Sequence, residues 1–435
     1  RSVTLTAKDK ICLCETRECT PEACPYANGY YARIKDALWD VLDVPCLTAE
    51  TLQEYAERHM VCPFELGLDS SLWSDVIIGD YNYLFDPVVH LVRFFESAGD
   101  YIFLVDEAHN LPGRAREMHS AALTKTSFYE AKKLLGKGKS SLKNALTKVN
   151  DVFIEWRHRA EEETAARDGR FGKTFFLKER SEEFDHLLNR LCEPLEAWLD
   201  DHREPDETHT ALLQLYFDVR AWLRVADTFD DHFVLQITAS GSEVRAAQLC
   251  LDPSAFLADS FALGRAAVLF SATLAPASYY KDLCGVPEAR AVALRSPFPA
   301  GNQGLFCIGN VSTRYKDRDA SLAIVEESLA TMVRARCGNY LAFFPSYAYM
   351  EQAYAQFKEH CPEINCIKQE NAMDEQQKAA FLAQFVPGPS QTLLGFAVMG
   401  GVFGEGVDLT GDRLIGVGIV GPGLPQVGPR QEQLR

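Results

Sequence analysis

The stretch FLVDEAHN, residues 103–110, decides how the rest of the chain is interpreted. It ends an uncharged run that predicts a buried strand, and Asp106 and Glu107 follow at the carboxyl end of that strand. Open α/β sheets bind their ligands at this edge. Two adjacent carboxylates there suit nucleotide hydrolysis, because one can hold Mg²⁺, usually through water, while the other orients or deprotonates the attacking water. His109 is then placed to sense the γ-phosphate, whereas an Asp-Glu pair alone more often marks an acidic corner between a strand and a loop.

A second apolar strand, VLFSATL at residues 268–274, also ends in polar side chains. Ser271, Ala272 and Thr273 follow its apolar part, and the two hydroxyl groups are expected to hydrogen-bond to the acidic loop and relay its state. A Ser or Thr at the end of a strand is more often a turn residue or a helix cap. The pattern therefore becomes specific only in combination with DEAH.

Short apolar runs of this kind recur along the chain and predict buried parallel strands, because they are rich in β-branched or aromatic residues and lack charge. They occupy residues 75–80, 101–107, 266–273, 340–346, 392–398 and 413–420. Helical patterns lie between several of them. We therefore predict an α/β fold with doubly wound parallel sheets.

Residues 113–255 contain no comparable run, and they predict a mostly helical inserted domain. Amphipathic patterns predict helices at 181–201 and 210–229, and a short strand at 232–239 closes the domain. In the first helix the apolar residues that keep helical spacing are Phe184, Leu187, Leu188, Leu191 and Leu195.

The bulk composition is that of a folded globular protein. With 435 residues, of which 47% are hydrophobic and 24% charged, the chain is long enough for roughly three domains. No apolar run reaches the length of about 18 residues that a membrane span needs, so no membrane partner is expected. The net charge of −17 argues mildly against a protein that coats nucleic acid. Residues 125–148 nevertheless carry seven lysines against one acid, which a solvated helical surface explains most simply.

Five cysteines gather near the start of the chain. They are Cys12, Cys14, Cys19 and Cys24 in ICLCETRECTPEACPY, and Cys62 after a predicted helix at 48–60. The expected location is a reducing cytoplasm, because no secretory leader is seen and the total of 13 cysteines is odd, and the expected use is a metal or cofactor site. Thiolates bind zinc and iron–sulfur clusters alike. The lack of paired C-x₂-C knuckles argues against a zinc ribbon, and a loose set of thiols is a further alternative.

Taken in order, these landmarks resemble those of superfamily 2 DNA helicases of the XPD/DinG type. The order is the cysteine cluster, DYNYLFD (80–86), VDEAHN (105–110), SATL (271–274), RSPFP (295–299), FFPSY (343–347) and GGVFGEGVDLTGDRL (400–414). The resemblance implies two RecA-like motor domains with parallel sheets, and an iron–sulfur cluster unit and a mostly helical arch inserted in the first. The implied domains are a cluster region at 1–74, a first motor domain at 75–112 and 256–285, an arch at 113–255 and a second motor domain at 286–435.

The resemblance also assigns roles to residues. DEAHN becomes the Walker B motif, with Asp106, Glu107 and His109 as its catalytic residues, and SATL becomes the motif that couples hydrolysis to strand movement. In the second motor domain, GEGVDL turns Glu405, Gly406 and Asp408 toward ATP and nucleic acid, with an ordinary Gly-rich turn as the alternative. Tyr81 and Asn82 offer stacking surface and an amide to single-stranded DNA, although tyrosines after a buried strand are more often core residues.

For the cysteines, the resemblance implies a [4Fe–4S] cluster with Cys19, Cys24 and Cys62 among its ligands. The first ligand is ambiguous between Cys12 and Cys14, and the distance from Cys19 favours Cys12. Zinc and loose thiols stay open as alternatives. Four ligand bonds would tie together a small, loop-rich unit that lacks enough core to fold alone.

Two parts of the family pattern are missing from the sequence. One is the G-x-x-x-x-G-K-[ST] loop that cradles the phosphates, and the other is the Q-x-x-G-R-x-[IV]-R motif that supplies an arginine finger. The chain is therefore expected to be a fragment of a longer helicase, and to hydrolyse ATP poorly or not at all by itself.

The implied function is that of an ATP-dependent DNA helicase. It would move 5′→3′ on single-stranded DNA and open duplex junctions as a monomer, with ATP as substrate and with Mg²⁺ and the [4Fe–4S] cluster as cofactors. One alternative is a DinG-like exonuclease, although the sequence lacks the carboxylate constellation of a metal nuclease. The other is a nucleic-acid-binding module without motor activity.

Overall fold

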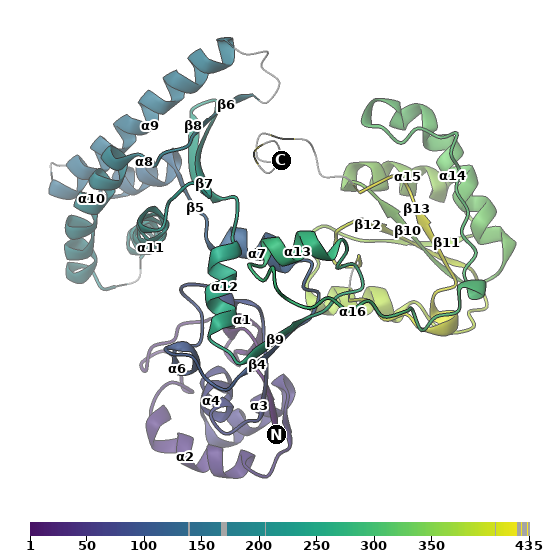
Figure 1. Ribbon diagram of the computed structural model, residues 1–435, viewed down its shortest axis with the longest axis horizontal. Helices are drawn as coiled ribbons and strands as arrows, with labels where there is room; N and C mark the ends of the chain where they lie inside the picture. Colours follow the sequence, from purple (N-terminus) through teal and green to yellow (C-terminus); the bar gives the residue numbers. More distant parts are fainter. Residues whose placement is uncertain are drawn as a thin grey trace. The chain divides into compact units, whose positions relative to one another are not determined.

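The computed structural model describes residues 1–137, 140–166, 172–204, 206–404, 406–423, 428 and 433. It divides into two compact units, Arg1–Ala293 and Leu294–Gly428, whose helices and strands are drawn in Figure 1. Each unit has hydrophobic cores of its own. No helix in the described ranges is long and apolar enough to cross a membrane.

A small parallel sheet stands at the start of the first unit. Its central strand β1 (Ser2–Thr4) pairs with β2 (Cys46–Leu47) on one side and with β3 (Val76–Ile78) on the other. Four helices accompany the sheet: α1 (Lys8–Ile11), α2 (Tyr30–Val41), α3 (Ala49–His59) and α4 (Pro63–Ser71). Helix α3 confirms the helix predicted at 48–60. The cysteine-bearing segment 12–29 connects α1 to α2, so this small core anchors it at both ends.

A second pair of parallel strands carries the acidic motif. Strand β4 (Ile102–Val105) pairs with β9 (Ala266–Leu269), and Val105 lies opposite Leu269. One face of this pair packs against α7 (Leu111–Met118) and α12 (Ser254–Ala262). On the other face, Ile102, Leu104 and Val268 are 54%, 69% and 51% exposed. Because both strands run in the same direction, the residues after Val105 and Leu269 leave the sheet at the same edge.

Short helices connect this pair to the rest of the first unit. They are α5 (Asn82–Phe85), α6 (Val92–Phe95) and α13 (Ala277–Leu283). Phe85 of α5 is buried in the same core as β4 and β9, so the segment after β3 is attached to the acidic strand.

Between α7 and α12 the chain forms a separate insertion. Its antiparallel sheet has the order β5-β8-β7-β6 and consists of β5 (Ala121–Thr124), β6 (Lys173–Leu177), β7 (Phe233–Ser240) and β8 (Glu243–Cys250). One core joins this sheet to α8 (Lys125–Leu134), α9 (Ser141–Ala166), α10 (Glu182–Asp201) and α11 (Glu207–Asp227). Helices α10 and α11 and strand β7 confirm predicted elements. The sequence does not predict β5 and β8, because both are rich in Ala, which is a weak strand former.

The second unit is built around a parallel sheet of order β11-β12-β10-β13. Its strands are β10 (Asn339–Phe344), β11 (Asn365–Lys368), β12 (Leu393–Val398) and β13 (Gly416–Ile419). Helices α14 (Arg318–Ala335) and α15 (Tyr347–His360) share one core with the sheet, and α16 (Glu375–Ala383) contributes to a second core with it. Three short 3₁₀ helices, η1 (Ala300–Asn302), η2 (Tyr315–Asp317) and η3 (Gly411–Arg413), lie in its loops.

All six predicted strand runs form parallel strands, namely β3, β4, β9, β10, β12 and β13, but the predicted burial is wrong for β3, an edge strand that is exposed along its length. The prediction of an α/β fold with parallel sheets is therefore confirmed. Strands β1, β2 and β11 also belong to these sheets, but at two to four residues they are too short to give a periodic signal.

Candidate active site

The turn after β4 presents the two predicted carboxylates. Asp106 and Glu107 are the first residues beyond Val105, and both are exposed. Glu107 has a φ of 45°, a left-handed conformation that is uncommon for a residue with a side chain. The Asp106 carboxylate accepts the backbone N–H of Glu107 at 2.7 Å. One carboxylate is thus tied to the turn itself, and the other is available for partners elsewhere.

A hydrogen-bonded group joins this turn to the end of β9. The Ser271 hydroxyl donates to Glu107 Oε2 at 3.1 Å and lies 2.8 Å from His109 Nδ1. His109 Nδ1 is also 3.2 Å from Glu107 Oε2. Since the serine proton goes to Glu107, Ser271 accepts a hydrogen bond from the imidazole, which assigns the proton of His109 to Nδ1. The structure therefore brings together three predicted residues from two strands that are far apart in the sequence.

Thr273 and Ala272 complete this end of β9. The Thr273 backbone N–H donates to Ser271 Oγ at 3.2 Å, and the two hydroxyl oxygens are 3.4 Å apart. Ala272 is exposed, and its methyl group has nothing to donate or accept. The expected contact between a hydroxyl and the acidic loop is present for Ser271, and Thr273 orients that serine.

Tyr81 also contacts the turn. Its hydroxyl donates to the backbone carbonyl of Glu107 at 3.0 Å and to that of Asp106. Burial raises the pKa of Tyr81, and the negative charges of Asp106 and Glu107 add to the rise. Asn82 follows at the start of α5, where its backbone N–H donates to Asp80 Oδ1 at 3.0 Å. The sequence gives no sign of the Tyr81 contact, because a bond from a hydroxyl to a backbone carbonyl leaves no residue pattern.

Among the cysteines near the start of the chain, Cys14 and Cys24 lie close together in space. Cys14 Sγ is 3.9 Å from Cys24 Sγ. Burial raises the pKa of Cys14 to about 11, and the thiols of Cys24 and Cys12 add to the rise. Cys19 is exposed. Within the part of the chain that the structure describes, no group of three or more His, Cys, Asp or Glu residues is arranged to hold a metal ion.

Cys62 lies at the start of α4, apart from that pair in the sequence. Burial raises the pKa of Cys62, against the opposing effect of backbone N–H groups and of the Lys8 ammonium. The pKa of Lys8 is raised, against the effect of its burial, by the Glu65 carboxylate, to which Lys8 donates at 3.3 Å, and by the nearby thiols of Cys19 and Cys62. This lysine is a neighbour of the thiols that the sequence does not reveal, since it precedes the cysteine motif.

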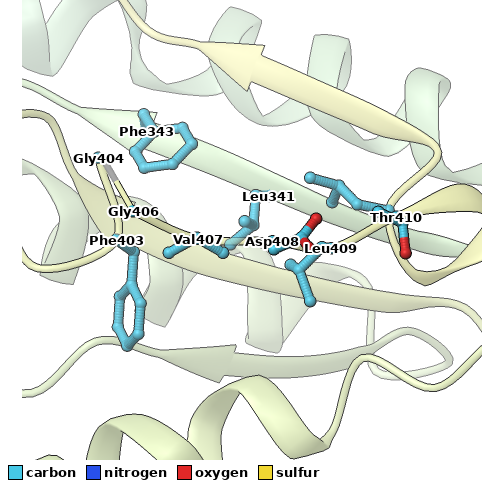
Figure 2. A pocket seen from close by; sticks show the side chains of 10 residues that line it. Leu341, Phe343, Phe403, Gly404, Gly406, Val407, Asp408, Leu409 and Thr410 are labelled. Atoms are coloured by element: carbon cyan, nitrogen blue, oxygen red, sulfur yellow. The ribbon is translucent and has the colours of Figure 1, made fainter. Parts of the chain in front are cut away.

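In the second unit, Gly406 and Asp408 line a pocket of about 350 Å³. Its walls are Leu341 and Phe343 of β10 and the segment after β12, as Figure 2 shows. Gly406 has a φ of 69°, which glycine adopts without strain. Among the lining residues that the structure describes, Asp408 is the only charged one. Glu405, the third residue predicted here, lies outside the described residues.

Two family models match the chain. The one described as DEAD_2 matches residues 2–128, which include the five cysteines and the acidic turn. The one described as Helicase C-terminal domain matches residues 329–435, which include the pocket segment after β12.

Curated relatives are similar to most of this chain. The ATP-dependent DNA helicase CHL1 of Coccidioides immitis is 22% identical over 429 residues, which cover 86% of this chain and 49% of CHL1. The XPD helicase subunit of general transcription and DNA repair factor IIH from Schizosaccharomyces pombe is 24% identical over 419 residues, which cover 80% of this chain and 52% of that subunit. The chain thus spans about half the length of these relatives.

The fold is similar to that of solved XPD structures. The structure named XPD_Helicase matches with a TM-score of 0.56 and 17% identity, over 100% of this chain and 74% of its own. The structure named XPD_APO matches with a TM-score of 0.51 and 18% identity, over 84% of this chain and 69% of its own. At these identities the likeness concerns the fold alone. Since helicase family models match toward both ends and relatives align along most of its length, the chain belongs to the XPD/DinG-type superfamily 2 helicases.

Proposed function

We propose that this chain forms the motor of an ATP-dependent DNA helicase that moves 5′→3′ on single-stranded DNA and opens duplex junctions. The observation that carries the proposal is the hydrogen-bonded group of Glu107, His109 and Ser271 at the ends of two adjacent parallel strands. The relatives described above are named helicases, which supports the same activity. The 5′→3′ direction and action as a monomer come from the family resemblance.

In this proposal the turn after β4 carries the hydrolytic chemistry. Asp106 would hold Mg²⁺, which neutralises phosphate charge, and Glu107 would orient or deprotonate the attacking water. Ser271 donates to the same Glu107 oxygen that this chemistry uses. A change at Glu107 therefore changes the hydrogen bonds at the end of β9, which is how hydrolysis would reach the rest of the motor.

The proposal also gives roles to the remaining predicted residues. Gly406 and Asp408, together with Glu405, would contact ATP or DNA from the second unit. The amide of Asn82 and the ring of Tyr81 would contact single-stranded DNA, because base stacking on an aromatic ring tolerates any sequence.

Replacement of the two carboxylates tests the hydrolytic role. In the full-length protein, Glu107→Gln and Asp106→Asn should each lower DNA-stimulated ATP hydrolysis by at least about 100-fold, because each removes a charge that acts on water or metal. Glu117→Gln on α7 makes the same chemical change at an exposed surface residue and should leave the rate unchanged. Hydrolysis by Glu107→Gln at the wild-type rate would disprove the assignment.

Strand-displacement assays separate the helicase from its alternatives. ATP-dependent release of a labelled strand, lost in Glu107→Gln, is the expected result. DNA binding without ATP-dependent release would instead identify a binding module, and shortening of the labelled strand would identify an exonuclease.

We further propose that the cysteine region holds a [4Fe–4S] cluster. The donor chemistry fits, since Cys12, Cys14, Cys24 and Cys62 are free thiols that are not fully exposed. The described thiols do not surround one point in this structure, and Cys14 is the near neighbour of Cys24. Cys12 or Cys14 would therefore supply the first ligand, with Cys19, Cys24 and Cys62 as the others. The cluster would supply four bonds that fix the long connection between α1 and α2.

Iron analysis tests the cluster. Anaerobically purified protein should be brown, absorb at about 400 nm and contain about four irons per chain. Cys62→Ser should lower the iron content, whereas Cys46→Ser, at an exposed position in β2, should leave it unchanged. Single replacements of Cys12 and Cys14 show which of them is the ligand. Colourless protein with stoichiometric zinc would contradict the proposal.

A further inference from the structure

Tyr81 contacts the acidic turn through its hydroxyl, and a role in stacking on DNA bases would require only its ring. One phenol hydroxyl serves two successive backbone carbonyls, those of Asp106 and Glu107. In a β-strand, successive carbonyls point in opposite directions, so a single hydroxyl does not reach both. Tyr81 can therefore bind both carbonyls only when Asp106 and Glu107 form a turn and do not continue the extended strand β4.

That conformation is one the turn does not favour by itself. The φ of 45° at Glu107 is strained for a residue with a side chain, and it persists only where contacts around it are fixed. The Glu107 side chain is half exposed, so its direction depends on the backbone and on its contacts with Ser271 and His109 rather than on surrounding core residues. Other backbone contacts of the turn include those of Ala108 N–H with the carbonyl of Phe270, at 3.1 Å, of Asn110 N–H with that of Glu107, at 2.9 Å, and of Glu107 N–H with Asp106 Oδ1, at 2.7 Å.

Tyr81 itself is held in place by the core. Its ring meets Phe85 edge to face at 6.3 Å, and its carbonyl accepts the Phe85 N–H at 2.9 Å. Phe85 is 4% exposed and makes a second edge-to-face contact with Phe261 at 5.4 Å. The hydroxyl is thus presented to the turn from a fixed point.

We propose that Tyr81 is a positioning residue for ATP hydrolysis, whose hydroxyl holds the turn that directs the Glu107 carboxylate. The inference rests on the proposed role of Glu107 in hydrolysis. It assigns the hydroxyl of Tyr81, and not only its ring, a task at the nucleotide site. It also links the segment that follows the cysteine region to the site of hydrolysis, since Tyr81 lies three residues after β3.

The Tyr81→Phe variant isolates the hydroxyl, because the ring and its contacts with Phe85 are retained. In the full-length protein, kcat for DNA-stimulated ATP hydrolysis should fall about 10- to 100-fold, as expected when a reacting group is misplaced. The KM for ATP and the affinity for single-stranded DNA should stay unchanged. The rates are normalised to the measured number of ATP-binding sites, so that misfolded molecules do not contribute. Tyr83→Phe is the matched control, since Tyr83 packs against the N-terminal core instead, and its kcat should equal that of the wild type.

Hydrogen–deuterium exchange examines the same contact without the need for hydrolysis. The peptide that covers residues 103–110 should exchange faster in Tyr81→Phe than in the wild type or in Tyr83→Phe. Wild-type exchange in this peptide, or a kcat within twofold of the wild type while Glu107→Gln is inactive, would overturn the inference alone. An active Glu107→Gln variant would overturn the proposed function, and the exchange result would then still decide whether Tyr81 holds the turn.

Discussion

Ser271 connects the ends of the two parallel strands β4 and β9 of the first unit. Its oxygen lies within hydrogen-bond distance of the Glu107 carboxylate, the His109 imidazole, and both the backbone N–H and the hydroxyl of Thr273. A hydroxyl has one proton to donate, so its donation to Glu107 excludes donation elsewhere. Any event that removes Glu107 as an acceptor therefore makes the Ser271 hydroxyl donate its proton to a different acceptor. A serine with this set of neighbours can register the state of the carboxylate.

Asp185 shows a different use of a carboxylate, inside the core of the insertion. It is 6% exposed, its Oδ1 accepts the Trp222 indole N–H at 2.8 Å, and its Oδ2 lies 4.0 Å from Arg180 Nε. Burial raises the pKa of Asp185, against the effects of Trp222 and Arg180, and the charges of Asp227 and Glu182 add to the rise. Ionisation of this residue is therefore less favourable in the folded protein than in the unfolded chain.

We predict that Asp185→Asn stabilises the insertion increasingly as the pH rises. A raised pKa in the folded state gives stability that is present below the ordinary value of about 4 and is lost as the pH passes through the raised value. Asparagine does not ionise, so its advantage over the wild type should grow from about pH 4 upward and then level off. Melting temperatures across that range measure the difference. Glu193→Gln on the exposed side of α10 should show no such trend, and a constant difference for Asp185→Asn would contradict the prediction.

At the residue scale, the sequence predicts groups that carry chemistry but not the contacts between them. Asp106, Glu107 and Ser271 could be singled out because each follows an apolar run at a strand end. The hydrogen bonds from Tyr81 to the turn could not be predicted. They join Tyr81 to residues 25 and 26 positions further along the chain, and only the folded structure brings these segments together. The proximity of Lys8 to the thiols is likewise a product of folding and has no sequence signature.

Among the helices, the end of α13 is closely fitted to the start of α12. Gly285 has a φ of 66°, and the N–H groups of Gly285 and Val286 donate back to the carbonyls of Asp282 and Lys281 at 3.0 and 2.9 Å. This is the usual way in which a glycine ends a helix. A Cβ at Gly285 would lie 2.1 Å from the backbone oxygen of Ser254, so the two helices leave no room for a side chain.

We predict that Gly285→Ala lowers the free energy of unfolding by about 2–5 kcal/mol. About 1–2 kcal/mol comes from the left-handed backbone and about 1–3 kcal/mol from the displaced α12. Gly241→Ala in the β7–β8 turn is the matched control, since its φ is 61° but nothing lies within 4 Å of the added Cβ. It should cost only the backbone contribution. Urea unfolding of both variants measures the two effects, and equal losses would contradict the close fit of α13 to α12.

Elements were predictable from the sequence wherever burial gives a run of apolar residues. Strand β12 is buried along its whole length and appears as an uninterrupted apolar run. The antiparallel sheet of the insertion is different, because β8 contains Arg245 and Gln248 among small residues. Gln248 is fully buried in spite of its polarity, so neither periodicity nor hydrophobicity identifies that strand.

For the whole molecule, the order of the landmarks carried more information than any one of them. A DEAH string, a Ser-Ala-Thr string or a cysteine cluster has several explanations when taken alone. Their sequence along the chain predicted a helicase of this family, in agreement with the family models and relatives. The positions of the domain boundaries are a finer prediction. The structure divides the chain between Ala293 and Leu294, within the long connection between α13 and α14.

The insertion of the first unit begins and ends at neighbouring points. Cys250 N–H donates to Ser120 Oγ at 3.0 Å, Arg116 Nε donates to the Leu251 carbonyl at 2.7 Å, and β5 pairs with β8. Closing an unstructured loop of such length would cost about 4 kcal/mol of chain entropy, a cost that rises with the logarithm of its length. Here the sheet of the insertion joins its own ends, so the rest of the first unit is connected as if by a tight turn rather than by a long loop. The length and sequence of the insertion can therefore change with little effect on the stability of the strands that carry the acidic turn.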